Sequence, residues 1–194
     1  ELWAACARSA VAEGWRVHAE CFDISSAHHA GLAGAGVELS RHRLPFRRSQ
    51  RLQRYATKVV SPLAAMEKFQ PDVLLINEGA AFDLVSHPVL WPAWQRSSLK
   101  QVPYTTLVEL VHDDPPDASV SEQARTFLVD AAQVLCVSER NRLDLRRHIA
   151  DDLPRSRVVR NPVNLAPPYD FVPREATPTI RMASVARIDP LFKG

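Results

Sequence analysis

The chain is poor in the residues that mark several large classes of protein. Its 194 residues include three cysteines, Cys6, Cys21 and Cys136, which stand far apart and form no C-x-x-C pair. This usage predicts reduced, buried thiols in a cytoplasmic protein and no disulfide framework. No run of about 18 apolar residues is present, so no segment is predicted to span a membrane, and no signal peptide is visible.

The glycine content and the small net charge disfavour two further classes of function. The chain has six glycines, and no G-x-G-x-x-G follows an apolar strand pattern, which disfavours a nicotinamide dehydrogenase. The net charge is only +2, so no overall field favours nucleic acid as a partner. With 46% hydrophobic and 24% charged residues, the composition is typical of a globular domain that is long enough to bury a good core.

Strand and helix patterns alternate along the chain. The run Val73–Ile76 is continuously apolar, which is typical of a parallel strand buried on both faces. Ser119 and Glu122 stand in capping-box spacing and predict a helix start. Strands are expected at 15–22, 37–44, 73–76, 103–111, 134–137 and 157–159, and helices at 1–13, 47–69, 82–97, 119–133 and 138–153, with a short helix or loop at 25–36.

This alternation predicts the fold class. Strands that alternate with helices form right-handed βαβ crossovers and a parallel sheet with helices on both faces. We therefore expect an α/β protein with a Rossmann-like, doubly wound parallel sheet, whose first strand would precede Glu1.

The last stretch of the chain carries two cations at a predicted turn. An apolar strand pattern ends at Arg187, a turn follows through Asp189-Pro190, and Lys193 stands beside Gly194. Strand ends followed by turns are where α/β proteins bind ligands. Two cations held by a short turn can clamp a diphosphate through charge-assisted hydrogen bonds. A surface arginine and a surface lysine after a strand are the alternative interpretation.

Several short patterns agree in order and spacing with one known family. They are the helix pattern ending at Gly14 with Trp15-Arg-Val-His18 after it, then Pro71-Asp72-Val73, Val134-Leu-Cys-Val-Ser138, Asn161-Pro-Val-Asn164, Val185-Ala-Arg187 and Lys193-Gly194. Together they resemble glycosyltransferase family 4, whose enzymes have the two-domain GT-B fold. Pro162 and Asn164 stand where the family has Gly and Asp, and the family's Gly-rich acceptor loop and E-x7-E motif are not in this sequence.

The resemblance implies a domain plan and an activity. Residues 1–164 would form the N-terminal, acceptor-side domain, 165–178 a linker, and 179–194 the start of the donor-binding domain. The enzyme would move a sugar from a nucleotide sugar to an acceptor with retention of configuration, without a metal or another cofactor. Arg187 and Lys193 would hold the donor's diphosphate, and this fragment alone would be inactive.

The resemblance also points to a histidine after the strand at 103–111, near the transferred sugar and the acceptor. His112 follows that strand and stands before Asp113-Asp114, but the family's usual position falls nearer Glu109, so both residues are candidates for the catalytic role. A solvated loop histidine is the alternative for His112. A metal site is disfavoured because no third ligand has recognisable spacing.

Three further residues are candidates on the acceptor side. Asn77 and Glu78 follow the apolar run and can bind acceptor hydroxyls, unless they are simply a polar strand-end loop. Ser138 offers a hydroxyl and a helix N-terminus, which favours an anion, although capping alone explains it as well.

A basic helix face suggests one more partner. Arg47, Arg51, Arg54 and Lys58 share a face opposite the apolar stripe of the helix pattern. Such a helix can lie on an anionic membrane surface, which would suit a lipid-linked acceptor and a peripheral location at the cytoplasmic face. A solvated helix face is the alternative, and nucleic acid is disfavoured because few aromatic residues interleave.

Two other functions stay open at this stage. One is a nucleotide-sugar epimerase of the same GT-B shape, which needs no acceptor. The other is a non-catalytic α/β binding module that keeps the fold without the chemistry. The sugar, the base and the acceptor, whether carbohydrate or lipid-linked, are open as well.

Overall fold

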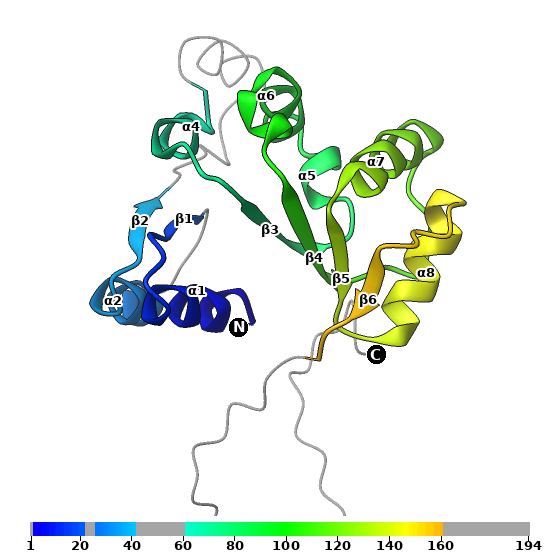
Figure 1. Cartoon of the computed structure of the whole chain (residues 1–194). Coiled ribbons are helices and arrows are strands. Elements are labelled where there is room, and N and C mark those ends of the chain that lie inside the picture. The colour runs from blue at the N-terminus through cyan, green and yellow to red at the C-terminus, as the bar shows by residue number, and fades with distance from the viewer. Residues whose placement is uncertain (1, 22–25, 42–60, 161–194) are drawn as a thin grey trace, which may run out of the picture. The chain divides into compact units, whose positions relative to one another are not determined.

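The computed structural model describes residues 2–21, 26–41 and 61–160, all within the first of two compact units, Glu1–Pro162 (Figure 1). The predicted basic face (Arg47, Arg51, Arg54, Lys58), the linker at 165–178 and the cation pair Arg187 and Lys193 lie outside the described residues. Those predictions are therefore untested by the structure.

Helices and strands alternate through the described part of the chain, as the sequence predicts. The order is α1 (Leu2–Ala12), β1 (His18–Cys21), α2 (Ser26–Gly34), β2 (Glu38–Arg41), α4 (Ala64–Phe69), β3 (Leu74–Ala80), α5 (Asp83–Ser86), α6 (Leu90–Arg96), a 3-10 turn (Ser98–Gln101), β4 (Tyr104–Leu110), α7 (Ala118–Asp130), β5 (Gln133–Cys136), α8 (Glu139–Ile149) and β6 (Ser156–Val158).

The described strands form two parallel sheets. One joins β1 and β2, and the other has four strands in the order β3-β4-β5-β6. In the larger sheet Glu78 pairs with Val108, Val108 with Cys136, and Cys136 with Val158. This mixed α/β architecture with parallel strands confirms the predicted Rossmann-like class.

One face of the four-stranded sheet carries the main core. Neighbouring strands follow one another in sequence, so right-handed crossovers bring the connecting helices to the same face. Figure 1 shows α5, α7 and α8 along that side of the sheet. Phe127 of α7 stacks on Tyr104 of β4 at a ring-centroid distance of 5.1 Å and makes a T-shaped contact with Trp94 at a ring-centroid distance of 5.9 Å.

Side chains outside α7 donate hydrogen bonds to backbone carbonyls at the C-terminal end of this helix. The last four carbonyls of an α-helix have no partner within it. The Tyr104 hydroxyl donates to the carbonyl of Phe127, and Arg155 donates to the carbonyl of Val129, 2.5 Å away. Both carbonyls belong to the last turn of α7, so these contacts fix the end of α7 against the sheet.

Four details differ from the sequence-based predictions. β3 runs to Ala80 and is not buried on both faces, since Val73 and Leu75 are 54% and 44% exposed. The helix predicted at 82–97 is divided into α5 and α6 around Pro88. α7 begins before Ser119 with no side-chain cap, so the capping box is wrong, and the thiol of Cys6 is exposed rather than buried.

A smaller core belongs to the first elements. Ala4 and Ala7 of α1 pack with Leu32 of α2 and with Val37. α1 ends where the sequence predicts, because Gly14 adopts a φ of +90° that glycine alone takes without strain. No helix in the described segments is long and apolar enough to cross a membrane.

Candidate functional site

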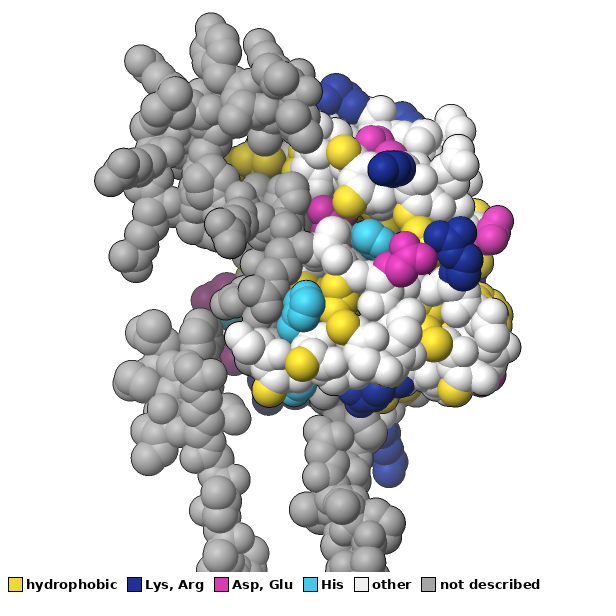
Figure 2. Space-filling view, turned by 90° about the vertical axis from the view of Figure 1, so that its left-hand side faces the viewer, with side chains coloured by type: hydrophobic (Ala, Val, Ile, Leu, Met, Phe, Trp, Pro, Cys, Tyr) yellow, Lys and Arg dark blue, Asp and Glu magenta, His cyan; other side chains and the backbone are white. Residues whose placement is uncertain are grey.

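A pocket of about 270 Å³ opens at the carboxyl ends of β3 and β4. Its walls are the turn between β3 and α5 and the loop that follows β4. Figure 2 draws the side of the molecule that lies to the left in Figure 1, where histidine, acidic and basic side chains lie close together on the surface. The lining residues are Ala80, Ala81, Phe82, Asp83, Ser86, His112, Asp114 and Pro116.

The β3–α5 turn is held by backbone donors. The N–H of Ala80 donates to Asp83 Oδ2 at 2.7 Å, and the N–H of Ala81 donates to the carbonyl of Leu110 at 2.7 Å. Phe82 adopts a left-handed conformation (φ 75°) and donates its N–H to Glu78 Oε2 at 2.8 Å. Each of these N–H groups therefore has an acceptor, and the wall of the pocket has one defined shape.

His112 lines this pocket, whereas the catalytic role suggested by the sequence stays a prediction. It stands two positions after the end of β4, and the buried Val111 anchors the backbone before it. Asp83 and Asp114 line the same pocket, so an imidazole and two carboxylates face one space. These groups can donate to and accept from the hydroxyls of a bound ligand.

Asp83 and Ser86 were missed as candidates from the sequence. The region was interpreted as one helix interrupted by prolines, whereas α5 is a single short turn that begins directly after β3. The available signal was an acidic residue in the first helical turn after a strand, which is a common helix-start position.

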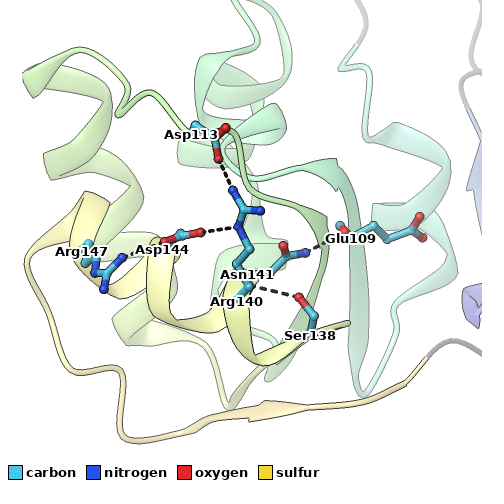
Figure 3. Close-up of polar contacts among 7 residues, drawn as sticks. All are labelled: Glu109, Asp113, Ser138, Arg140, Asn141, Asp144 and Arg147. Carbon is cyan, nitrogen blue, oxygen red and sulfur yellow. Dashed lines mark hydrogen bonds and ion pairs between the residues drawn. The ribbon is translucent and has the colours of Figure 1, made fainter. Parts of the chain in front are cut away.

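Glu109 and Asn77 are not among the residues that line the pocket. Side chains alternate along a strand, so Glu109 lies on the opposite face of the sheet from the buried Val108. Figure 3 shows the Glu109 carboxylate directed away from α8, while its backbone carbonyl accepts from Asn141 Nδ2 at 2.8 Å. Asn77 pairs with Leu107 and is exposed on the same face as Glu109. The roles assigned to both stay predictions.

Glu78 lies inside the core rather than at a strand-end loop. It is part of β3 and is 3% exposed, with Val85, Phe127 and Leu145 around the same space. The pKa of its carboxyl is raised to about 8: burial is the largest cause, the N–H groups of Phe82 and Asp83 oppose the rise, and the charge of Asp83 adds to it. An acceptor in the pocket would meet the β3–α5 turn, not this carboxyl.

The buried carboxyl makes stability depend on pH. The ordinary pKa of 4.5 rises to about 8 in the folded chain, so between these values the folded state holds a proton that the unfolded state has lost. Stability should therefore fall as pH rises through this window, by about 1.4 kcal/mol per pH unit, and become flat above it. Urea unfolding of the wild type and of Glu78→Gln from pH 5 to 9 measures this.

The variant isolates the contribution of Glu78. Burial also raises the pKa of Glu20, to about 7, so only the difference between the two proteins is informative. Equal slopes in the wild type and in Glu78→Gln would contradict the assignment.

Ser138 caps α8, as predicted. Its hydroxyl oxygen accepts the N–H of Asn141 at 3.1 Å (Figure 3). Arg140 in the same turn donates to Asp113 at 2.6 Å and lies 3.5 Å from Asp144. These contacts tie the start of α8 to the end of β4 and to the loop that carries His112, whereas binding of an anion by Ser138 stays a prediction.

Removing the cap has a measurable cost. Ser138→Ala should lower the free energy of unfolding by about 1 kcal/mol, because the N–H of Asn141 loses its acceptor. Ser138→Asp keeps an acceptor at the same position and should retain most of the stability. Chemical denaturation of the three proteins gives the comparison, and equal loss in both variants would show that the cap is not the cause.

Comparisons with protein-family models, with curated proteins and with solved structures find no match to this chain. Within the segments that the structure describes, no group of three or more His, Cys, Asp or Glu side chains is placed to hold a metal ion. The geometry of the pocket and the sequence patterns are thus the observations that bear on its function.

Proposed function

We propose that this chain is the acceptor-side part of a retaining glycosyltransferase, which moves a sugar from a nucleotide sugar to an acceptor bound beside His112. The observation that carries the proposal is the pocket at the carboxyl ends of β3 and β4, lined by His112, Asp83 and Asp114. In parallel α/β sheets ligands bind at this edge. The order of the family 4 patterns along the chain supports the same activity.

The chemistry of the pocket suits a sugar acceptor. Carboxylates and an imidazole bind hydroxyl groups, and an imidazole nitrogen can take the proton of an attacking hydroxyl. The volume of about 270 Å³ is near the lower end for ligand sites, which favours a single sugar ring.

The donor would bind elsewhere. Among the described residues that line the pocket there is no lysine or arginine, so this lining offers no cation to a diphosphate. By resemblance, that role falls to Arg187 and Lys193. Two charge-assisted contacts of about 1.5–3 kcal/mol each would together strengthen donor binding roughly a hundredfold to ten-thousandfold.

Sugar binding to the chain itself tests the proposal. We would titrate the ¹⁵N-labelled chain with the methyl glycosides of glucose, galactose, mannose and N-acetylglucosamine, and follow the amides of Ala81, Asp83 and His112. One of these sugars should shift the three amides together, and His112→Ala should weaken its binding about fivefold, as the loss of one hydrogen bond of about 1 kcal/mol implies.

The matched control is His28→Ala, the same substitution on α2 and outside the pocket, which should bind like the wild type. If none of the four sugars shifts the pocket amides, a non-catalytic binding module becomes the better account of the fold.

A further inference from the structure

The Glu78 carboxyl and the pocket are separated by a single turn of the chain. Phe82 and Ala81 line the pocket, and they also line the tightly packed space around Glu78, which has no room for a water molecule. Glu78 Oε2 accepts the N–H of Phe82, whereas Oε1 has no hydrogen-bond partner among the described residues. A buried polar atom without a partner is unusual enough in a folded protein to require an explanation.

The surroundings of Glu78 favour its neutral form. α7 contributes the apolar side chains Ala124, Phe127 and Leu128, and α8 contributes Leu145. The nearby titratable groups are few: Asp83 on α5, Tyr104 on β4, and His148 on α8, whose ring is 6.3 Å from that of Phe82. The Asp83 carboxylate opposes a second negative charge, and within residues 2–21, 26–41 and 61–160 no cation is among the groups that shift the pKa of Glu78.

The turn depends on this carboxyl. Phe82 is held in a left-handed conformation, which costs a non-glycine residue free energy, and its N–H points inward to Glu78. The next residue, Asp83, faces the pocket and accepts the N–H of Ala80. A movement of the Glu78 carboxyl would therefore shift Phe82 and, one residue further, Asp83 in the pocket wall.

We propose that Glu78 is a positioning residue whose protonation state sets the shape of the His112 pocket through the N–H of Phe82. The neutral carboxyl accepts that N–H and stays in the apolar core, so the turn keeps its form. The ionised carboxyl is poorly solvated there and is repelled by Asp83, so it moves toward water and carries the turn with it. The pocket is thus intact at neutral pH and altered in alkaline solution.

That Glu78 affects acceptor binding rests on the proposed function. That the protonation of Glu78 changes the shape of the pocket does not. The test therefore needs no ligand. We would record ¹H–¹⁵N spectra of the chain from pH 6 to 10 and follow the amides of Ala80, Ala81, Phe82, Asp83 and His112.

In the wild type these amides should titrate together with one midpoint in the alkaline range. Glu78→Gln keeps a carbonyl oxygen for the Phe82 N–H and cannot ionise, so it should keep the neutral-pH spectrum and lose the shared titration. Glu20→Gln, a change at a partly buried carboxyl on β1 whose pKa is also raised, should leave the titration in place. A shared titration that survives in Glu78→Gln, or pocket amides that do not respond to pH, would overturn the proposal.

If the shared titration is found and no glycoside binds, the positioning role stands and the proposed function fails. If a glycoside binds and the titration is absent, the reverse holds. The two ideas are thus separated by the same labelled sample.

Discussion

Under the transferase function that we propose, replacing His112 by alanine is expected to lower the rate of sugar transfer about 10²- to 10⁴-fold in a form of the protein that carries a complete donor-binding domain. A positioned base contributes this much when it takes the proton of the attacking group. His112 is the imidazole that lines the pocket, and the carboxylates of Asp83 and Asp114 face the same space. The rate is measured as transfer of labelled sugar from a nucleotide sugar to the acceptor identified by binding.

The change should appear in kcat more than in the affinity for the nucleotide, because the donor's diphosphate is assigned to other residues. His28→Ala is the matched control and should keep the wild-type rate. A His112→Ala enzyme with an unchanged rate would remove His112 from the chemistry and leave it as a surface residue of the loop after β4.

Truncating Phe127 to alanine is expected to destabilise the domain by about 3–5 kcal/mol. The ring is 3% exposed, stacks on Tyr104 and makes T-shaped contacts with Trp91 and Trp94. Its loss leaves a cavity that these rings cannot fill without leaving their contacts. Since domains of this size are stable by about 5–15 kcal/mol, the variant should lose a large part of its stability.

Urea denaturation measures the difference. Val129→Ala on the same helix is the control, because Val129 is exposed and its truncation should change stability by about 0.5 kcal/mol or less. A loss below about 1 kcal/mol for Phe127→Ala would mean that α7 does not pack on the sheet as described.

The order of elements was predictable from the sequence because each strand has a local signature. The apolar run before Ser138 and the cap itself identify β5 and the start of α8. The sequence has no local pattern that shows which strands lie next to each other in the sheet. Leu75 was expected to be buried on an apolar strand, yet β3 pairs with β4 alone among the described strands and leaves Leu75 exposed.

The site was predictable in part for the same reason. His112 stands just after a strand whose end is visible in the sequence, so its place at the sheet edge follows from the fold. Glu78 was misplaced because Asn77-Glu78-Gly79 has the composition of a loop. In the structure β3 continues through these residues, and the alternation of side chains turns Glu78 inward with Leu74. A buried carboxyl on a strand has no composition signal that separates it from a solvated one.

The most direct test of the account is whether sugar transfer requires an acceptor. A form of the protein with a complete donor domain would be incubated with UDP-, GDP- and ADP-glucose, each with and without the methyl glycoside that binds the pocket. We expect a disaccharide from one donor, only when the glycoside is present. An isomerised nucleotide sugar formed without any acceptor would identify an epimerase and contradict the account.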